Sequence, residues 1–224
     1  MSRQLIATNN ISGGFAAAEV IDVFGTPGAR PGLGQIGNFD DGKAVRKSYV
    51  SAGKSVFDET EWDVYGDSAT PQNVADMDPR VWAGAGSSPT SPSPTALSIN
   101  TSSPSAVTAS VDGPNLLITE VADPKDSYQS RFVELYSNNG AGQAVGQYNG
   151  KDVYLTLTSN TNVDFNGSVL LTGTAIGSDG FLVLCSSTSV FSTSYNTSSC
   201  DLASSSVINS NGDDSYAVSC CKVS

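Results

Sequence analysis

The chain has 224 residues, with 22 acidic side chains, 11 basic ones and no histidine, which gives a formal net charge of −11. So acidic a surface repels phosphate backbones and argues against nucleic-acid binding, and no apolar run approaches the ~18 residues that span a bilayer. Without histidine, the usual general base near neutral pH and the usual Ser-His and Cys-His catalytic pairs are missing. We therefore expect a protein that is not an enzyme, holds no cofactor, and neither binds nucleic acid nor inserts into a membrane.

The first part of the chain, residues 1–82, contains three expected strands. They cover residues 19–24, 43–47 and 57–65, and a stretch rich in Gly and Pro follows the first of them. A sheet of three short strands is marginal on its own. This part of the chain therefore needs a partner surface.

Residues 83–113 are a linker by composition. They are rich in Ser, Thr and Pro and contain too few apolar side chains to build a core. Such a sequence predicts an extended, semi-rigid segment, which in a secreted protein is O-glycosylated at sites such as Thr90, Ser91, Ser93 and Thr95. The alternative is a disordered loop without sugar.

The last part, residues 114–224, alternates short apolar runs with turn sequences such as Asn149-Gly150 and Asn211-Gly212. Strands are expected at residues 116–121, 131–136, 153–157, 168–171, 181–184 and 215–218. Short strands at this spacing predict a β-sandwich or barrel. No amphipathic helix is expected anywhere in the chain.

Four cysteines lie in this last part: Cys185, Cys200, Cys220 and Cys221. None of them forms a C-x-x-C pair, so a zinc site is disfavoured, and an even number in a Ser/Thr-rich acidic chain favours disulfides. The first choice is Cys185 with Cys200, with Cys220 or Cys221 as competing partners. A strained bridge between the two adjacent cysteines and four reduced thiols are the other possibilities.

Four N-x-[ST] sequons support an extracellular or cell-surface location, since they mark acceptor sites for glycans. The acceptors are Asn10, Asn100, Asn166 and Asn196. The residues after Met1 do not begin an apolar signal region. We expect either that a removed signal lies outside this numbering or that the sequence is a fragment of a longer chain.

Two groups of residues carry a family resemblance. Ile118-Thr119-Glu120-Val121, the run from Arg131 to Tyr136, the run from Gly180 to Cys185 and the run from Asn211 to Val218 resemble the first two thirds of a lamin-tail domain. The run from Val20 to Gly25, the Arg46-Lys47 pair and the run from Phe57 to Trp62 resemble its last third. In this chain the last third comes first.

The resemblance implies an all-β, immunoglobulin-like β-sandwich completed by a split or permuted segment. Residues 15–66 would complete residues 115–219 of the same chain as a circular permutant, or those of a neighbouring chain. The third possibility is that the sequence is a fragment of a tandem array, whose missing halves lie outside it. Because donated strands build open head-to-tail filaments, we expect a structural subunit of an extracellular glycosylated filament or surface assembly, whose partners are copies of itself and covalent glycans. The alternative is a monomeric adhesion or carbohydrate-binding accessory module.

A few other residues are candidate sites. Glu120 and Glu134 imitate a paired-carboxylate glycosidase site, although both match recurrent positions of the family that the chain resembles. Asp213 and Asp214 are candidate calcium ligands, although a turn explains their pattern as well. Of the two tryptophans, Trp62 is expected in the core and Trp82 at the edge of the linker. Arg46 and Lys47 are expected at a solvated strand end.

Overall fold

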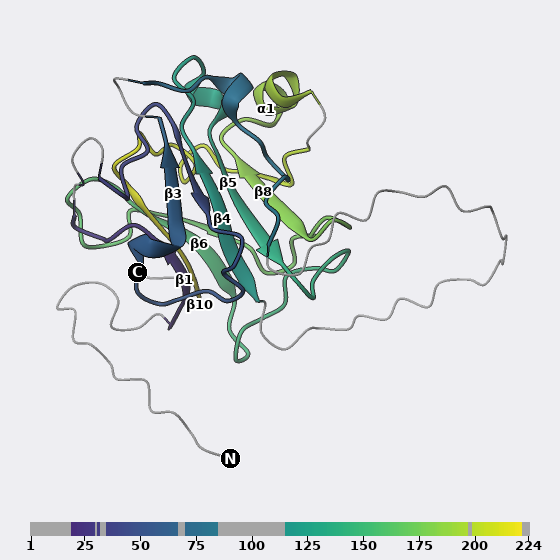
Figure 1. Cartoon of the computed structure of the whole chain (residues 1–224). Coiled ribbons are helices and arrows are strands. Elements are labelled where there is room, and N and C mark those ends of the chain that lie inside the picture. The colour runs from purple at the N-terminus through teal and green to yellow at the C-terminus, as the bar shows by residue number, and fades with distance from the viewer. Residues whose placement is uncertain are drawn as a thin grey trace, which may run out of the picture.

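A computed structural model describes residues 19–29, 31, 35–66, 70–84, 115–196 and 199–220. They form an all-β sandwich of two sheets with one α-helix (Figure 1). Sheet A has the order β1 (Glu19–Phe24), β10 (Ser215–Cys220), β6 (Val153–Thr158) and β7 (Gly167–Leu170). Sheet B has the order β3 (Trp62–Tyr65), β2 (Lys43–Arg46), β4 (Leu116–Ala122), β5 (Phe132–Ser137), β8 (Phe181–Cys185) and β9 (Leu202–Ala203). All neighbouring strands are antiparallel except β8 and β9, which are parallel.

Alternating side chains and tight turns explain why these segments form strands. In β6 the apolar residues Val153, Leu155 and Leu157 all enter the core between the sheets, as expected for a period of two. The turn before this strand is formed by Asn149 (φ 52°) and Gly150 (φ 71°). Two successive positive φ angles are favourable for an Asn-Gly pair and produce the tight turn that was expected there.

Every strand expected from the sequence has a counterpart in the structure, with small differences in bounds. The third one is shorter than expected, because Glu59–Glu61 form the 3-10 helix η1 before β3 begins. The short strand β9 was not expected. It has only two residues, and its pairing with β8 depends on the fold around it.

The sequence predicted no amphipathic helix, and the one α-helix of the described residues was missed because it is not clearly amphipathic. Thr188–Tyr195 form the α-helix α1, although the segment is rich in Ser and Thr and gives no clear amphipathic pattern. Its single fully buried side chain, Phe191, packs in an apolar cluster with Phe132. The helix therefore depends on tertiary packing more than on local propensity.

The N-terminal part (described residues of 19–84) completes the sandwich of the C-terminal part (115–220) within this one chain. Strand β1 pairs with β10 at the edge of sheet A, and β2 pairs with β4 in sheet B. In Figure 1 the purple and blue strands accordingly lie beside yellow and teal ones. The two parts are joined in sequence by residues 85–114, which lie outside the described residues, as do Thr90, Ser91, Ser93 and Thr95.

A second contribution of the N-terminal part is a strap, residues 70–84, which has no β-strand. It contains the 3-10 helix η2 (Val74–Asp76), which contacts α1. Beyond η2 the strap crosses in front of β5 and β8 (Figure 1), on the face of sheet B that points away from sheet A. Because of this cover, all seven residues of β4 are buried.

Candidate functional site

The joint between the two parts of the chain contains an aromatic cluster that comes wholly from the N-terminal part. The ring of Phe24 lies 5.4 Å from Phe39, 5.5 Å from Phe57 and 4.7 Å from Trp62, all in edge-to-face geometry. Phe24 is fully buried and Trp62 is 1% exposed. Trp62 is thus in the core, as expected. Without the N-terminal part, the sandwich would lose these large side chains.

An ion cluster lies buried at the same joint. The Arg46 guanidinium lies 3.0 Å from Asp22 Oδ1 and 3.0 Å from Glu61 Oε2, and it stacks 4.5 Å from the centre of the Trp62 ring. Asp22 also accepts a hydrogen bond from Ile118 N at 2.7 Å, so the cluster ties β1 to β4. Burial raises the pKa of Asp22 to about 6, against the opposing effect of Arg46. The expectation of a solvated Arg46 is wrong, because this arginine points into the core at 2% exposure.

On the outer face of sheet B, two carboxylates face each other across neighbouring strands. Glu120 of β4 is the register partner of Glu134 of β5, and both are buried under the strap. Glu134 accepts hydrogen bonds from Thr119 Oγ1 (2.6 Å) and from Arg80 N. Glu120 lies 4.0 Å from Lys43 Nζ. Burial raises the pKa of both carboxyl groups well above the usual range, and for Glu120 the neighbouring Glu134 adds to this effect.

A groove opens beside Glu120, between strands β2 and β3 and the strap. Its volume is about 590 Å³, which is in the range of small-molecule sites. Its lining includes Lys43, Tyr65, Asp78 and Glu120. The lining offers carboxylate acceptors, an ammonium donor and an aromatic ring, which suits a polar, hydroxyl-bearing ligand.

Paired-carboxylate hydrolysis needs both acids to flank the substrate bond. The structure does bring Glu120 and Glu134 together, but only Glu120 belongs to the lining of the groove. Glu134 is fully buried and its oxygens bind Thr119 and Arg80. In this geometry Glu134 acts as an acceptor that holds the strap.

The buried carboxyl groups give a pH-dependent stability. Because burial raises the folded-state pKa of Glu120, Glu134 and Asp22, the folded protein binds more protons than the unfolded chain above about pH 4.5, so the free energy of unfolding falls as pH rises. Glu120→Gln is expected to raise the melting temperature at pH 8 and to flatten its decline between pH 5 and pH 8. Thermal melts at several pH values check this, with the exposed Glu59→Gln as the matched control. A wild-type melting temperature that rises steadily over this range would contradict the account.

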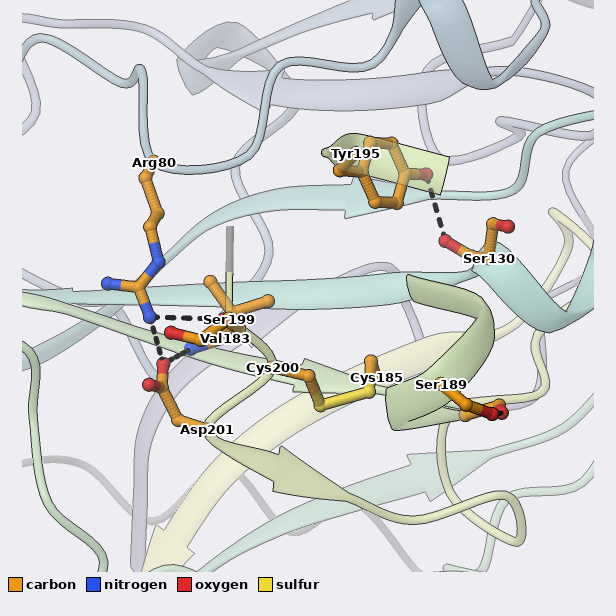
Figure 2. Close-up of a disulfide and its surroundings, with 10 residues drawn as sticks. Arg80, Ser130, Val183, Cys185, Ser189, Tyr195, Ser199, Cys200 and Asp201 are labelled. Carbon is orange, nitrogen blue, oxygen red and sulfur yellow. Dashed lines mark hydrogen bonds and ion pairs between the residues drawn. A yellow bond between two sulfur atoms is a disulfide. The ribbon is translucent and has the colours of Figure 1, made fainter. Parts of the chain in front are cut away.

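The other expected site residues have mixed outcomes. The pairing of Cys185 with Cys200 is confirmed by a disulfide with a Cα–Cα distance of 5.8 Å (Figure 2). Asn166 and Asn196 are both exposed, while Asn10, Asn100 and Cys221 lie outside the described residues. Cys220 and the two calcium candidates, Asp213 and Asp214, are buried.

The calcium candidates do not form a metal-binding group with their neighbours. Asp213 is 6% exposed and Asp214 is 4% exposed, and Asp214 Oδ1 accepts a hydrogen bond from Asn160 N at 2.8 Å. Among the residues that the structure describes, no group of three acidic, Cys or His side chains is placed to hold a metal ion. Across the same residues, no helix is long and apolar enough to cross a membrane.

The strap and the side chains that hold it in place were not predicted from the sequence. Trp82, expected at the free edge of the linker, is only 8% exposed, and its Nε1 donates to Arg46 O at 2.6 Å. Arg80 binds two acidic side chains of the C-terminal part, Asp179 and Asp201. The one signal in the sequence was the group of apolar side chains immediately before the linker, at Met77, Val81 and Trp82.

In comparisons with protein-family models, with curated proteins and with solved structures, nothing matches the chain.

Proposed function

We propose that this protein is a structural subunit of an extracellular, glycosylated filament or surface assembly. In it, the N-terminal part of one chain completes the C-terminal sandwich of the next, in a sandwich of lamin-tail type. The observation that carries the proposal is the position of β1, β2 and β3. Strand β1 lies at one edge of sheet A, and β3 and β2 lie at one edge of sheet B. All three are joined to the C-terminal part in sequence only through residues 85–114.

The same contacts suit a connection between chains. The joint consists of the β1–β10 and β2–β4 pairs, the buried ion cluster and the strap. If residues 85–114 run to a neighbouring molecule, each of these contacts is retained. Such an exchange of an identical element is a low-cost route to assembly, and it gives an open filament when the contact is head-to-tail.

The length of the linker fits this arrangement. Trp82 and Leu117, which lie near its two ends, belong to one apolar cluster, so closure within a chain would need only a short loop. The Ser/Thr/Pro-rich residues 83–113 reach on the order of 95 Å at about 3.1 Å per residue in the extended polyproline form. That reach is ample for a neighbouring subunit.

A C-terminal part without its donor would be a strong acceptor. It would expose the edges of β4 and β10 and the core surface that Phe24, Phe39 and Trp62 cover. Exposed strand edges beside apolar surface recruit further strands. This acceptor character favours completion by whichever donor is nearest.

The surface of the protein is consistent with an oxidising, extracellular environment. A disulfide joins Cys185 and Cys200, as is typical of secreted proteins. The sequon residues Asn166 and Asn196 are exposed. We include covalent glycans in the proposal on the basis of these positions and of the linker composition.

Negative-stain electron microscopy of the protein from its natural source, purified without denaturant, tests the proposal. Regular filaments are expected, and they should be lost when the donor is disabled by Trp62→Ala. Uniform compact monomers over a wide concentration range would overturn it.

The groove beside Glu120 favours a second candidate, a monomeric adhesion or carbohydrate-binding accessory module. Tyr65 is 45% exposed beside this groove, and Asp78 and Glu120 supply acceptors for hydroxyl groups. Titration calorimetry with soluble oligosaccharides tests it. Saturable binding that is lost in Tyr65→Ala would favour this function over the structural one.

A further inference from the structure

The strap lies on the outer face of sheet B, where most of the side chains that contact its residues 77–82 belong to the C-terminal part of the chain. The strap residues 77–82 place three side chains into three different environments along this face. Met77 is 5% exposed, Arg80 has a side chain that is 15% exposed, and Trp82 is 8% exposed. Their spacing along the chain is that of an extended peptide with separate anchors.

The first anchor, Met77, occupies an apolar pocket between β5, β8 and α1. Its cluster consists of residues of the C-terminal part: Ala122, Phe132, Val183, Cys185 and Phe191. The Phe132 and Phe191 rings stand edge to face at 5.7 Å. An unbranched thioether side chain suits such an irregular, aromatic-lined site.

The second anchor, Arg80, lies in an acidic socket. Its guanidinium is 2.9 Å from Asp179 Oδ2 and 2.5 Å from Asp201 Oδ2, and it donates to Ser199 O at 3.2 Å. Figure 2 shows Arg80 reaching Asp201 and Ser199 beside the disulfide. Asp201 also accepts from Val183 N at 2.7 Å, which holds its carboxylate against β8. Charge-assisted, multiply bonded contacts of this kind give specificity for arginine.

The backbone at Arg80 is part of the same recognition. Its φ of 68° lies in the left-handed region, which a non-glycine residue adopts only when its surroundings hold it there. The Arg80 N–H donates to Glu134 Oε2, so the buried carboxyl group of β5 fixes this turn in the strap. The peptide is thus held by its main chain as well as by its side chains.

The third anchor, Trp82, packs at the other end of the face. Its ring lies 5.2 Å from Tyr136, which in turn lies 5.0 Å from Phe181. Leu117 and Phe181 of the C-terminal part and Val50 of the N-terminal part complete this apolar cluster. A buried aromatic side chain at one end and an arginine in a charged socket are typical of the few residues that dominate a binding interface.

We propose that this face is a peptide-recognition groove whose occupant in the assembly is residues 77–82 of a second copy of the chain, with Met77, Arg80 and Trp82 as its anchors. The identity of this partner rests on the proposed exchange of the N-terminal part between chains. The groove is continuous with that joint, because Trp82 Nε1 binds the carbonyl of Arg46 at the end of β2. Charge complementarity supports the choice, since the ion pairs of both Asp179 and Asp201 are made with Arg80.

The test measures binding of a fluorescent synthetic peptide of residues 73–84 to the full chain carrying Met77→Ser, Arg80→Ala and Trp82→Ala. These three substitutions remove the anchoring side chains of the chain's own strap, so that the peptide can bind in its place. Fluorescence anisotropy should show saturable binding that is at least about tenfold weaker for the peptide with Arg80→Ala, and similarly weaker when the full chain also carries Asp201→Asn. The matched control is a peptide with the exposed Val81→Ala, which should bind as the unchanged peptide does. Equal affinity for the Arg80→Ala peptide, or no binding to a chain that circular dichroism shows to be folded, would overturn the proposal.

Hydrogen exchange on the unmodified full chain keeps the proposal testable if the triple variant does not fold. The amides of residues 74–84 are expected to exchange faster than those of β1 to β3, and Arg80→Ala should accelerate only the former. If the amides of residues 74–84 and those of β1 to β3 exchange at one common rate, the strap does not bind as a separate unit and the proposal is overturned. Peptide binding without any strand exchange between chains would leave the groove in place and instead contradict the proposed filament.

Discussion

Arg46→Met is expected to lower the free energy of unfolding by about 3–5 kcal/mol, because it leaves buried carboxylates without their cation. Asp22 is fully buried and Glu61 is 6% exposed, and each lies 3.0 Å from the arginine that would be removed. Methionine keeps much of the side-chain length, so the loss reflects charge more than cavity formation. Equilibrium denaturation in urea, monitored by tryptophan fluorescence, measures the change.

Two further variants separate charge from packing in this cluster. Lys47→Ala, at a neighbouring residue whose side chain is 32% exposed, should change the free energy of unfolding by less than about 1 kcal/mol. Combining Arg46→Met with Asp22→Asn and Glu61→Gln should recover part of the lost stability, because no unpaired charge is then buried. An unchanged urea midpoint for Arg46→Met alone would contradict a buried ion cluster.

Removal of the disulfide by Cys185→Ala and Cys200→Ala together is expected to cost about 3 kcal/mol, given the 15-residue separation of the two cysteines. The bridge restricts the unfolded chain, and it also holds α1 and Asp201 near β8. We therefore expect the strap to loosen as well, since Asp201 binds Arg80. Chemical denaturation gives the stability, and hydrogen exchange of residues 74–84 reports on the strap.

Reduction of the unmodified protein is the natural control for this prediction. A thiol reductant should reproduce most of the loss seen with the double variant, whereas the double variant itself should not respond to the reductant. Identical denaturation midpoints for the oxidised and reduced protein would show that the bridge contributes nothing to stability.

The strands were predictable because they depend on local patterns. A period of two in β6 and the Asn149-Gly150 turn are visible in a few consecutive residues. The pairing of Cys185 with Cys200 was also within reach, because the two cysteines are close in sequence. In each case the information lies within one short segment.

The strap, the helix and the buried arginine were not predictable in this way. Residues 70–84 have no periodic pattern, and their burial depends on apolar side chains of β4, β5 and β8 far away in the sequence. Arg46 resembles any charged residue at a strand end until β1 brings Asp22 within 3.0 Å of it. The carboxylates Glu120 and Glu134 could be named from the sequence, but their cover by the strap could not.

Cross-linking between two tagged versions of the full chain tests most directly whether the N-terminal part completes a neighbouring sandwich. One version carries Ala44→Cys and the other Val121→Cys, at residues that are register partners in the β2–β4 pair. After co-expression and mild oxidation, the account predicts covalent heterodimers in non-reducing electrophoresis, and covalent polymers when both substitutions are in one chain. If the two versions never cross-link, and the double variant closes only within single chains, the claim that neighbouring chains exchange their N-terminal parts is contradicted.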